Sequence, residues 1–277
     1  MTSAQMKIQN LRIHAFVDRP GAPRCFVKCA IEPQITDGTL GERMCLQILS
    51  KFPIPRAVDL NPEEIEGWAI PPGAPYLATE ALPGGPLCRS GLSPMERLGA
   101  WLFMVECLVA FRRHELVYTD VKCYNVLVDR KSKTMSVIDF GSMVVLPQIH
   151  KFRTFAHTDG FQAPEQITGL RASEATLVYQ TAATLGCALV GFKSTDPHRR
   201  GHGVAALARS LSERGAPGLG ALVRRSLDPD PAVRPKNYED LLEAAVRSGI
   251  PPTARRFWRQ LRRPSAEALE EVGLLGP

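Results

Sequence analysis

The chain has 277 residues, of which 44% are hydrophobic and 22% are charged. This length fits one large domain or two small lobes, and this balance of residues excludes a wholly disordered chain. The net charge of +6 does not by itself favour nucleic acid as a partner, because clusters of arginines are most often solvated faces. No apolar run reaches the roughly 20 residues that a membrane span requires, so we expect no spanning segment.

Seven cysteines are scattered along the chain, and no two of them have the C-x-x-C spacing of common zinc sites. We therefore expect no zinc site and mostly buried, reduced thiols, as in a cytoplasmic protein. The first residues lack the apolar core of a secretory signal, which favours the same compartment.

The first third of the chain is predicted to be rich in strands. Short runs of β-branched and aromatic residues predict strands at 11–17, 25–30 and 76–81. Between the second and the third of these, apolar residues at every fourth position predict a helix over 40–49. A segment rich in glycine and proline at 82–87 marks the predicted boundary with the rest of the chain.

The remainder is predicted to be mainly helical. Ser93, Pro94 and Glu96 are typical of the N-cap and first turn of a helix, which we expect to run to about residue 114. Further elements are predicted downstream: strands at 126–128 and 135–138, and helices at 174–190, 203–213, 218–226 and 238–248. The prolines at 251 and 252 are expected to end the compact part, and the tail beyond them can form a helix that packs back on it.

The segment 116–128 is the most informative for chemistry. Asp120, Lys122 and Asn125 form the pattern D-x-K-x-x-N, and Asp139 begins an Asp-Phe-Gly triplet farther along. Carboxylate and amide oxygens are ligands that suit Mg²⁺. A carboxylate can also accept the proton of an attacking hydroxyl, and a lysine can follow a transferred phosphoryl group. These are the groups that phosphoryl transfer requires.

These motifs, followed by Ala-Pro-Glu at 163–165, resemble those of the eukaryotic-type (Ser/Thr) protein kinases. The resemblance covers roughly residues 11–248. It implies an α+β, bilobal protein-kinase-like fold, with a small β-rich N-lobe and a larger helical C-lobe that enclose a cleft. The expected bounds are about 1–81 for the N-lobe, about 82–250 for the C-lobe and 251–277 for a basic and then acidic tail.

The resemblance also assigns roles to residues, with ATP and Mg²⁺ as cofactors and a protein as substrate. Asp120 and Lys122 would be catalytic, and Asn125 and Asp139 would hold the metal. Upstream, Cys25-Phe-Val-Lys28 resembles the strand that carries the phosphate-binding lysine. The remaining nucleotide-binding assignments are Glu42 as the partner of Lys28, Thr79 as the gatekeeper, and the backbone of Glu80 and Leu82 at the adenine edge.

Two further contacts are implied by the same resemblance. Arg234, in the segment 227–235, is expected to pair with Glu165 and so to hold two distant segments in register. This pair argues for a protein kinase over a kinase of small molecules. Thr158 is expected to contact Asp120 and to shape the substrate site.

The sequence departs from the family pattern in three places. No G-x-G-x-x-G precedes Lys28, so the loop that covers the phosphates is shortened or replaced. Tyr118-Thr119 replaces the usual His-Arg, so Thr119 cannot bind a phosphate on the activation segment, and we expect activity without phosphorylation there. Leu177 replaces the aspartate that usually anchors the catalytic loop, which must then be held another way, with Tyr118 as the candidate.

The function that the sequence favours is transfer of the γ-phosphoryl group of ATP to a protein hydroxyl, of the Ser/Thr type. Two alternatives stay open. The chain could be a pseudokinase scaffold that binds nucleotide weakly or not at all, as the missing glycine loop suggests. It could also be a kinase-fold enzyme that acts on a non-protein acceptor or transfers a nucleotidyl group. The sequence specifies neither the substrate nor an oligomeric state.

Overall fold

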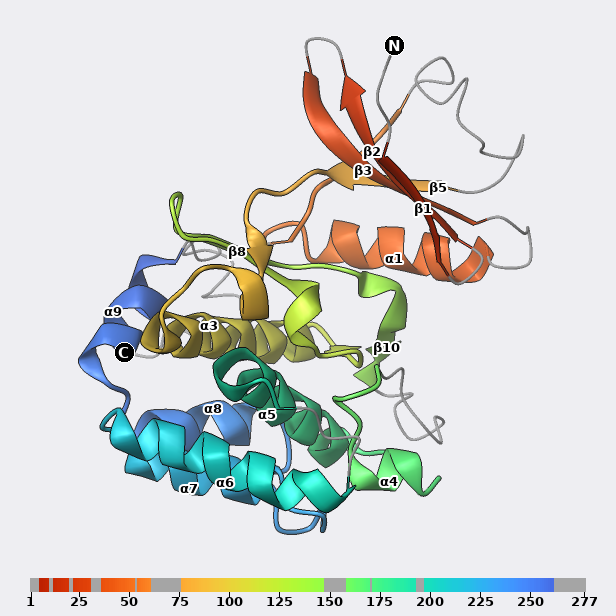
Figure 1. Cartoon of the computed structure of the whole chain (residues 1–277). Helices are drawn as coiled ribbons and strands as arrows, with labels where there is room; N and C mark the ends of the chain where they lie inside the picture. Colours follow the sequence, from red (N-terminus) through yellow and green to blue (C-terminus); the bar gives the residue numbers. More distant parts are fainter. Residues whose placement is uncertain are drawn as a thin grey trace.

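The computed structural model describes residues 5–9, 12–19, 22–30, 36–52, 54–60, 76–146, 158–169, 171–192 and 197–261. A twisted sheet with one helix beneath it forms the N-terminal third, and a larger group of helices lies below them (Figure 1). This arrangement confirms the predicted α+β architecture of two lobes. No helix in the described ranges is long and apolar enough to cross a membrane.

The N-lobe sheet is antiparallel, with the strand order β1-β2-β3-β5-β4. Its strands and the helix α1 beneath it are β1 (Gln5–Gln9), β2 (Arg12–Arg19), β3 (Ala22–Ala30), β4 (Ala57–Val58), β5 (Tyr76–Glu80) and α1 (Thr36–Ile48). The three predicted strands and the predicted helix are present, whereas β1 and β4 were not predicted. Only two residues separate β1 from β2, and the register pairs Gln9 with Arg12 across them.

The register of β3 against β5 decides which side chains face the C-lobe. Lys28 lies opposite Leu77, and Phe26 lies opposite Thr79. Because side chains alternate between the two faces of a strand, these four residues share one face of the sheet. That face meets the cleft between the lobes.

The C-lobe is built around α3 (Pro94–Arg113), which begins with the predicted capping box. Ser93 Oγ accepts the N–H of Glu96, and the Glu96 carboxylate accepts the N–H of Ser93. Trp101 on α3 is buried and donates through Nε1 to the carbonyl of Thr181, at 2.8 Å, on the next long helix. This bond fixes two central helices to each other.

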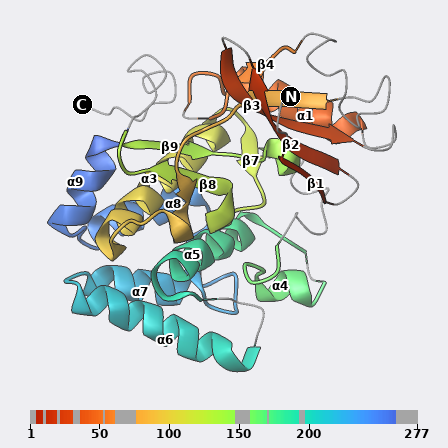
Figure 2. The same ribbon diagram turned by 45° about the horizontal axis from the view of Figure 1, so that its top comes forward.

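The remaining helices complete the lobe, with α6 and α7 on its far side from the sheet in both Figure 1 and Figure 2. They are α4 (Pro164–Ile167), α5 (Glu174–Val190), α6 (Pro197–Glu213), α7 (Pro217–Ser226), α8 (Tyr238–Arg247) and α9 (Pro252–Gln260). The predicted helices at 174–190, 203–213, 218–226 and 238–248 are therefore confirmed. The ends differ by at most a few residues, except that α6 begins earlier.

Short strands and 3-10 turns line the side of the C-lobe that faces the sheet. A three-stranded sheet joins β6 (Gly85–Pro86), β8 (Val126–Asp129) and β9 (Thr134–Val137), and β7 (Leu116–Tyr118) pairs with β10 (Met143–Val145). The 3-10 turns are η2 (Leu87–Arg89), η3 (Cys123–Asn125) and η4 (Phe140–Ser142). The predicted hairpin at 126–138 is thus present, and its turn sits between β8 and β9.

Helix α9 packs against the C-lobe, as predicted for a helix in the tail, whereas the prediction that the compact part ends at residues 251 and 252 is wrong. Pro252 takes the first helical position, where a proline needs no N–H partner, so it begins a helix instead of ending the fold. A Cβ on Gly99 of α3 would lie 2.5 Å from the carbonyl oxygen of Ala254, so the glycine permits close packing of the two helices. Trp258 Nε1 also donates to Glu106 at 2.9 Å. The acidic part of the predicted tail lies outside the described residues.

A buried ion pair connects α4 to the segment before α8. The Arg234 guanidinium donates two bonds to the Glu165 carboxylate, at 2.7 and 2.9 Å. Its other donors reach the carbonyls of Asp228, Pro229 and Ala175. Burial by itself would raise the pKa of Glu165, but the hydrogen bonds and the charge of Arg234 hold that pKa below its usual value. The predicted pairing of these two residues is confirmed.

We expect Arg234→Ala to lower the free energy of unfolding by about 3–5 kcal/mol, because it leaves the Glu165 carboxylate buried without its partner. The matched control is Arg247→Ala, which breaks an exposed pair with Glu243 and should cost at most about 1 kcal/mol. Urea denaturation measures both values. Equal losses in the two variants would contradict the structural role of the pair.

The same pair makes the loss of stability in Arg234→Ala dependent on pH. The folded pKa of Glu165 is lowered, so its ionisation stabilises the fold above the unfolded pKa of about 4.3, and this stabilisation is lost as the pH falls through the folded pKa. The difference in the free energy of unfolding between wild type and Arg234→Ala should therefore become smaller in acid.

Candidate active site

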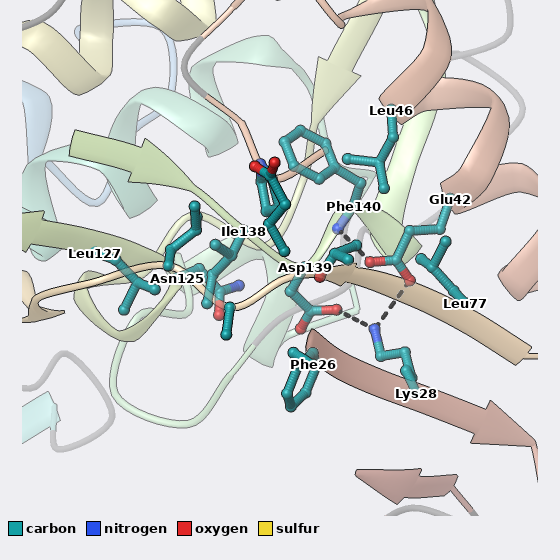
Figure 3. Close-up of a pocket in the computed structure, with 15 residues that line it drawn as sticks. Phe26, Lys28, Glu42, Leu46, Leu77, Asn125, Leu127, Ile138, Asp139 and Phe140 are labelled. Atoms are coloured by element: carbon teal, nitrogen blue, oxygen red, sulfur yellow. Dashed lines mark hydrogen bonds and ion pairs between the residues drawn. The ribbon is translucent and has the colours of Figure 1, made fainter. Parts of the chain in front are cut away.

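A cavity of about 310 Å³ lies between the N-lobe sheet and the C-lobe, and Figure 3 shows its lining. Seven of the nine predicted site residues line it: Lys28, Glu42, Thr79, Glu80, Leu82, Asn125 and Asp139. They come from β3, α1, β5 and the chain after it, η3, and the residue before η4. The cleft therefore collects side chains that are up to 111 positions apart in the sequence.

Lys28 lies between two carboxylates that come from different parts of the fold. Its Nζ donates to Glu42 Oε2 at 2.9 Å and to Asp139 Oδ1 at 2.6 Å. Burial alone would lower the pKa of Lys28, but the negative charges of Glu42 and Asp139 outweigh it and raise that pKa. Lys28 is therefore a permanent cation at the wall of the cavity (Figure 3), and its predicted pairing with Glu42 is confirmed.

Glu42 also joins the two lobes. Its second oxygen, Oε1, accepts the backbone N–H of Phe140 at 3.0 Å. Glu42 is only 5% exposed and Lys28 only 6%, so both carboxylate oxygens are used in an environment where an unpaired charge would be costly. One side chain thus fixes α1 against β3 and against the turn η4.

Asp139 and Phe140 point in opposite directions. Asp139 has a left-handed backbone, with φ of 67°, a conformation that is strained for a residue other than glycine and that clusters at functional sites. Phe140 is buried, and its ring packs edge-on against Phe111 and Tyr118 at centroid distances of 5.8 Å. The anchored ring turns the Asp139 carboxylate into the cavity, toward Lys28 (Figure 3).

Tyr118 holds the catalytic loop through hydrogen bonds of its buried hydroxyl and of its backbone carbonyl. Its hydroxyl donates to the carbonyl of Ile138 at 2.7 Å and accepts from Asn125 Nδ2 at 2.8 Å. Tyr238 on α8 donates to the Tyr118 carbonyl at 2.8 Å. Burial, and then the charges of Asp139 and Asp120, raise the pKa of Tyr118 well above its usual value, so the phenol stays a neutral donor. The expectation that Tyr118 helps to hold this loop is confirmed.

Two threonines make further bonds where the sequence departs from the family pattern. Thr119 Oγ1 donates to the carbonyl of Ser142, the last residue of η4, at 2.6 Å. Thr184 on α5 donates through Oγ1 to the carbonyl of Val121 at 3.2 Å. Neutral hydroxyls therefore tie this loop to its neighbours, and sequence reasoning missed Thr184 because a threonine inside a helix carries no distinctive signal.

Asp120 and Lys122 do not line the cavity itself but lie beside it. Lys122 Nζ contacts Asp120 Oδ2 at 2.5 Å and Thr158 Oγ1 at 2.8 Å, and the Thr158 hydroxyl donates to Asp120 Oδ1 at 3.0 Å. The predicted contact of Thr158 with Asp120 is confirmed. Asn125 Nδ2 donates to the Asp120 carbonyl at 3.1 Å, which connects this triad to the cavity wall.

The cavity also has apolar walls that the sequence did not single out. Phe26 on β3 lines it from the N-lobe, and Leu127 on β8 lines it from the C-lobe. From the sequence, Phe26 was assigned only to the strand that carries Lys28. Its role as a wall follows from the two-residue period of the strand, which puts it on the same face as the lysine.

Comparison with known proteins supports a protein kinase fold. Residues 75–211 match the protein kinase domain family, and the chain belongs to that family, of the eukaryotic type. A curated relative, the serine/threonine-protein kinase Nek8 of Danio rerio, is 23% identical over 229 residues, which cover 77% of this chain and 32% of the relative. The chain thus spans about a third of the length of that protein.

We expect Tyr118→Phe to lower the free energy of unfolding by about 1–3 kcal/mol, because the Asn125 amide and the Ile138 carbonyl lose a buried partner. It should also weaken the binding of magnesium nucleotide, since Asn125 loses its orientation. Denaturation and equilibrium dialysis measure the two effects.

Tyr76→Phe is the matched control, because Tyr76 makes one bond, to the carbonyl of Leu60 at 3.1 Å, and lies outside the cavity lining. It should leave nucleotide binding unchanged. If the two variants behaved alike in both measurements, Tyr118 would have no special part in holding the loop.

Proposed function

We propose that the chain is an ATP-dependent protein kinase that transfers the γ-phosphoryl group to a protein hydroxyl of the Ser/Thr type. The observation that carries this proposal is the contact of Lys28 with Asp139 at 2.6 Å, on the wall of a cavity that Asn125 also lines. A cation and two oxygen ligands at one end of an apolar cavity suit a magnesium-bound triphosphate.

The donor set fits the metal that this proposal requires. Within the described part of the chain, the side-chain hydrogen bonds of Asn125 to Tyr118 and Asp120 use its amide nitrogen, which leaves the side-chain oxygen to serve as a ligand. Asp139 supplies a carboxylate from the other side. Bound Mg²⁺ would neutralise phosphate charge, while Lys28 holds the α- and β-phosphate oxygens and Glu42 holds Lys28.

The transfer step falls to Asp120 and Lys122 in this proposal. Asp120 would orient the acceptor hydroxyl and accept its proton, because it offers a carboxylate on the loop that Asn125 connects to the cavity wall. Lys122, held between Asp120 and Thr158, would stabilise the charge on the transferred group. The acceptor side of the site would lie beside the segment that ends in Ala-Pro-Glu, because Thr158 contacts both Asp120 and Lys122.

The base of the nucleotide would lie at the apolar end of the cavity. Thr79 is the gatekeeper in this arrangement, and the backbone of Glu80 and Leu82 meets the adenine edge. Phe26 and Leu127 supply the apolar surface against which a planar base can pack.

A pseudokinase is the second candidate, and one observation favours it. With only two residues between β1 and β2, the chain has no room there for the glycine-rich loop that covers the phosphates in the family. Nucleotide binding without turnover would be the expected behaviour of such a scaffold.

Asp139→Asn should lower the rate of phosphoryl transfer by at least about 100-fold, because it removes a charge that stabilises the metal-bound transition state. The assay incubates purified protein with Mg-ATP and a generic protein substrate, and mass spectrometry identifies the modified residues. Asp129→Asn, at the end of β8 and outside the cavity lining, is the matched control and should keep the wild-type rate.

The alternatives give different results in the same assay. Modification that persists in Asp139→Asn would overturn the assignment of this carboxylate. A nucleotide monophosphate adduct on the product would indicate nucleotidyl transfer. A thermal shift with ATP but no product from wild type would favour the pseudokinase.

Phosphatase treatment of the active protein should leave its rate unchanged, because Thr119 offers no cation to bind a phosphate on the activation segment. Thr154→Val should likewise keep activity; Thr154 lies outside the described residues. Loss of activity after phosphatase treatment, with recovery on rephosphorylation, would show that another group performs the task of the missing arginine.

A further inference from the structure

Three of the scattered cysteines meet where the loop that carries Lys122 and Asn125 packs against α5. Cys88 lies in η2, Cys123 in η3 and Cys187 in α5, and their sulfur atoms all lie within 4.8 Å of one another. The Sγ atoms of Cys123 and Cys187 are 3.2 Å apart. Cys123 is fully buried, whereas Cys88 and Cys187 are half-buried, so the cluster has an inner ligand and a side that can be reached from outside.

We propose that Cys88, Cys123 and Cys187 bind one zinc ion through three thiolates. Zinc–sulfur bonds are about 2.3 Å long, so tetrahedral geometry places the sulfurs roughly 3.8 Å apart. This separation lies between the 3.2 Å of the Cys123–Cys187 pair and the 4.8 Å within which all three sulfurs lie. Thiolates select soft ions such as zinc over magnesium or calcium. The metal site is therefore chemically distinct from the oxygen ligands of Asn125 and Asp139.

The surroundings suit such an ion. Three thiolates and a Zn²⁺ ion together carry a net charge of −1, whereas the same three thiolates around Cu⁺ would carry −2. Arg89 follows Cys88 directly and lies over the ring of Tyr124, which follows Cys123, with 5.7 Å between the guanidinium carbon and the ring centroid. A cation thus lies beside the cluster. Among the described residues the cluster has three ligands, which leaves the fourth position of the zinc to water.

A bound ion would connect the catalytic loop to α5. Cys123 lies between Lys122 and Asn125, and Cys187 is on the helix where Leu177 replaces the usual anchoring aspartate. Coordination bonds to both cysteines would hold the loop to α5 through residues that do not line the cavity. This consequence for activity rests on the proposed function, whereas zinc binding itself does not.

The test uses the full chain, freed of metal with a chelator and kept reduced. Competition with a chromophoric chelator should give one equivalent of zinc for wild type. Cys88→Ala and Cys187→Ala each remove a ligand and should weaken zinc binding. The loss of affinity should exceed the roughly 10–100-fold that loss of an outer-shell partner costs. Cys107→Ala, a buried cysteine of α3 outside the cluster, is the matched control and should bind as wild type does.

Cobalt substitution gives an independent readout of the ligands. Wild type should show thiolate-to-cobalt charge-transfer absorption, and Cys187→Ala should lose most of it. Equal zinc affinity in wild type, Cys88→Ala, Cys187→Ala and Cys107→Ala, or no zinc binding by wild type, would overturn the proposal. So would a disulfide between Cys123 and Cys187 that peroxide forms at the same rate with and without zinc, because the pair would then be a redox couple. Each readout is independent of kinase activity.

Discussion

The contact of one buried ammonium with two carboxylates is the constraint on which the cleft depends. Lys28 comes from the sheet, Glu42 from α1 and Asp139 from the C-lobe. A charge in this environment is tolerated only with its partners in place, so the three segments can be positioned only together. The bond from the Phe140 N–H to Glu42 extends the same requirement to the turn that orients Asp139. The two lobes are thus joined at the point where the chemistry is proposed.

The catalytic loop shows how neutral groups can replace charged anchors. Tyr118 connects Asn125 to the Ile138 carbonyl, and Tyr238 and Thr184 bond to the backbone of the same loop. These hydroxyls are buried, where hydrogen bonds are strong and strengthen one another. These neutral bonds are the basis of the proposal that the loop needs no added phosphate to order it, where Thr119 replaces the usual arginine.

Much of this site could be predicted because its residues lie in short motifs with fixed spacing. The pairs Lys28–Glu42 and Glu165–Arg234 were predicted from such motifs, and α5 was predicted at 174–190 because its apolar pattern is long and regular. The strand β1 is polar and short, so its pattern was too weak to detect. The cysteine cluster was missed because its members are brought together only by packing between η2, η3 and α5. No local spacing reports a contact of that kind.

The phenyl ring of Phe26 has a consequence for chemical probes. It makes one wall of the cavity broad, flat and aromatic, on the same strand face as Lys28. Heteroaromatic inhibitors gain a stacking surface there, while compounds with substituents that need a small side chain at this position would clash. Replacement of Phe26 by a small residue would leave a cavity that an enlarged inhibitor can fill. This position can therefore be used to inhibit this chain selectively in the presence of other kinases.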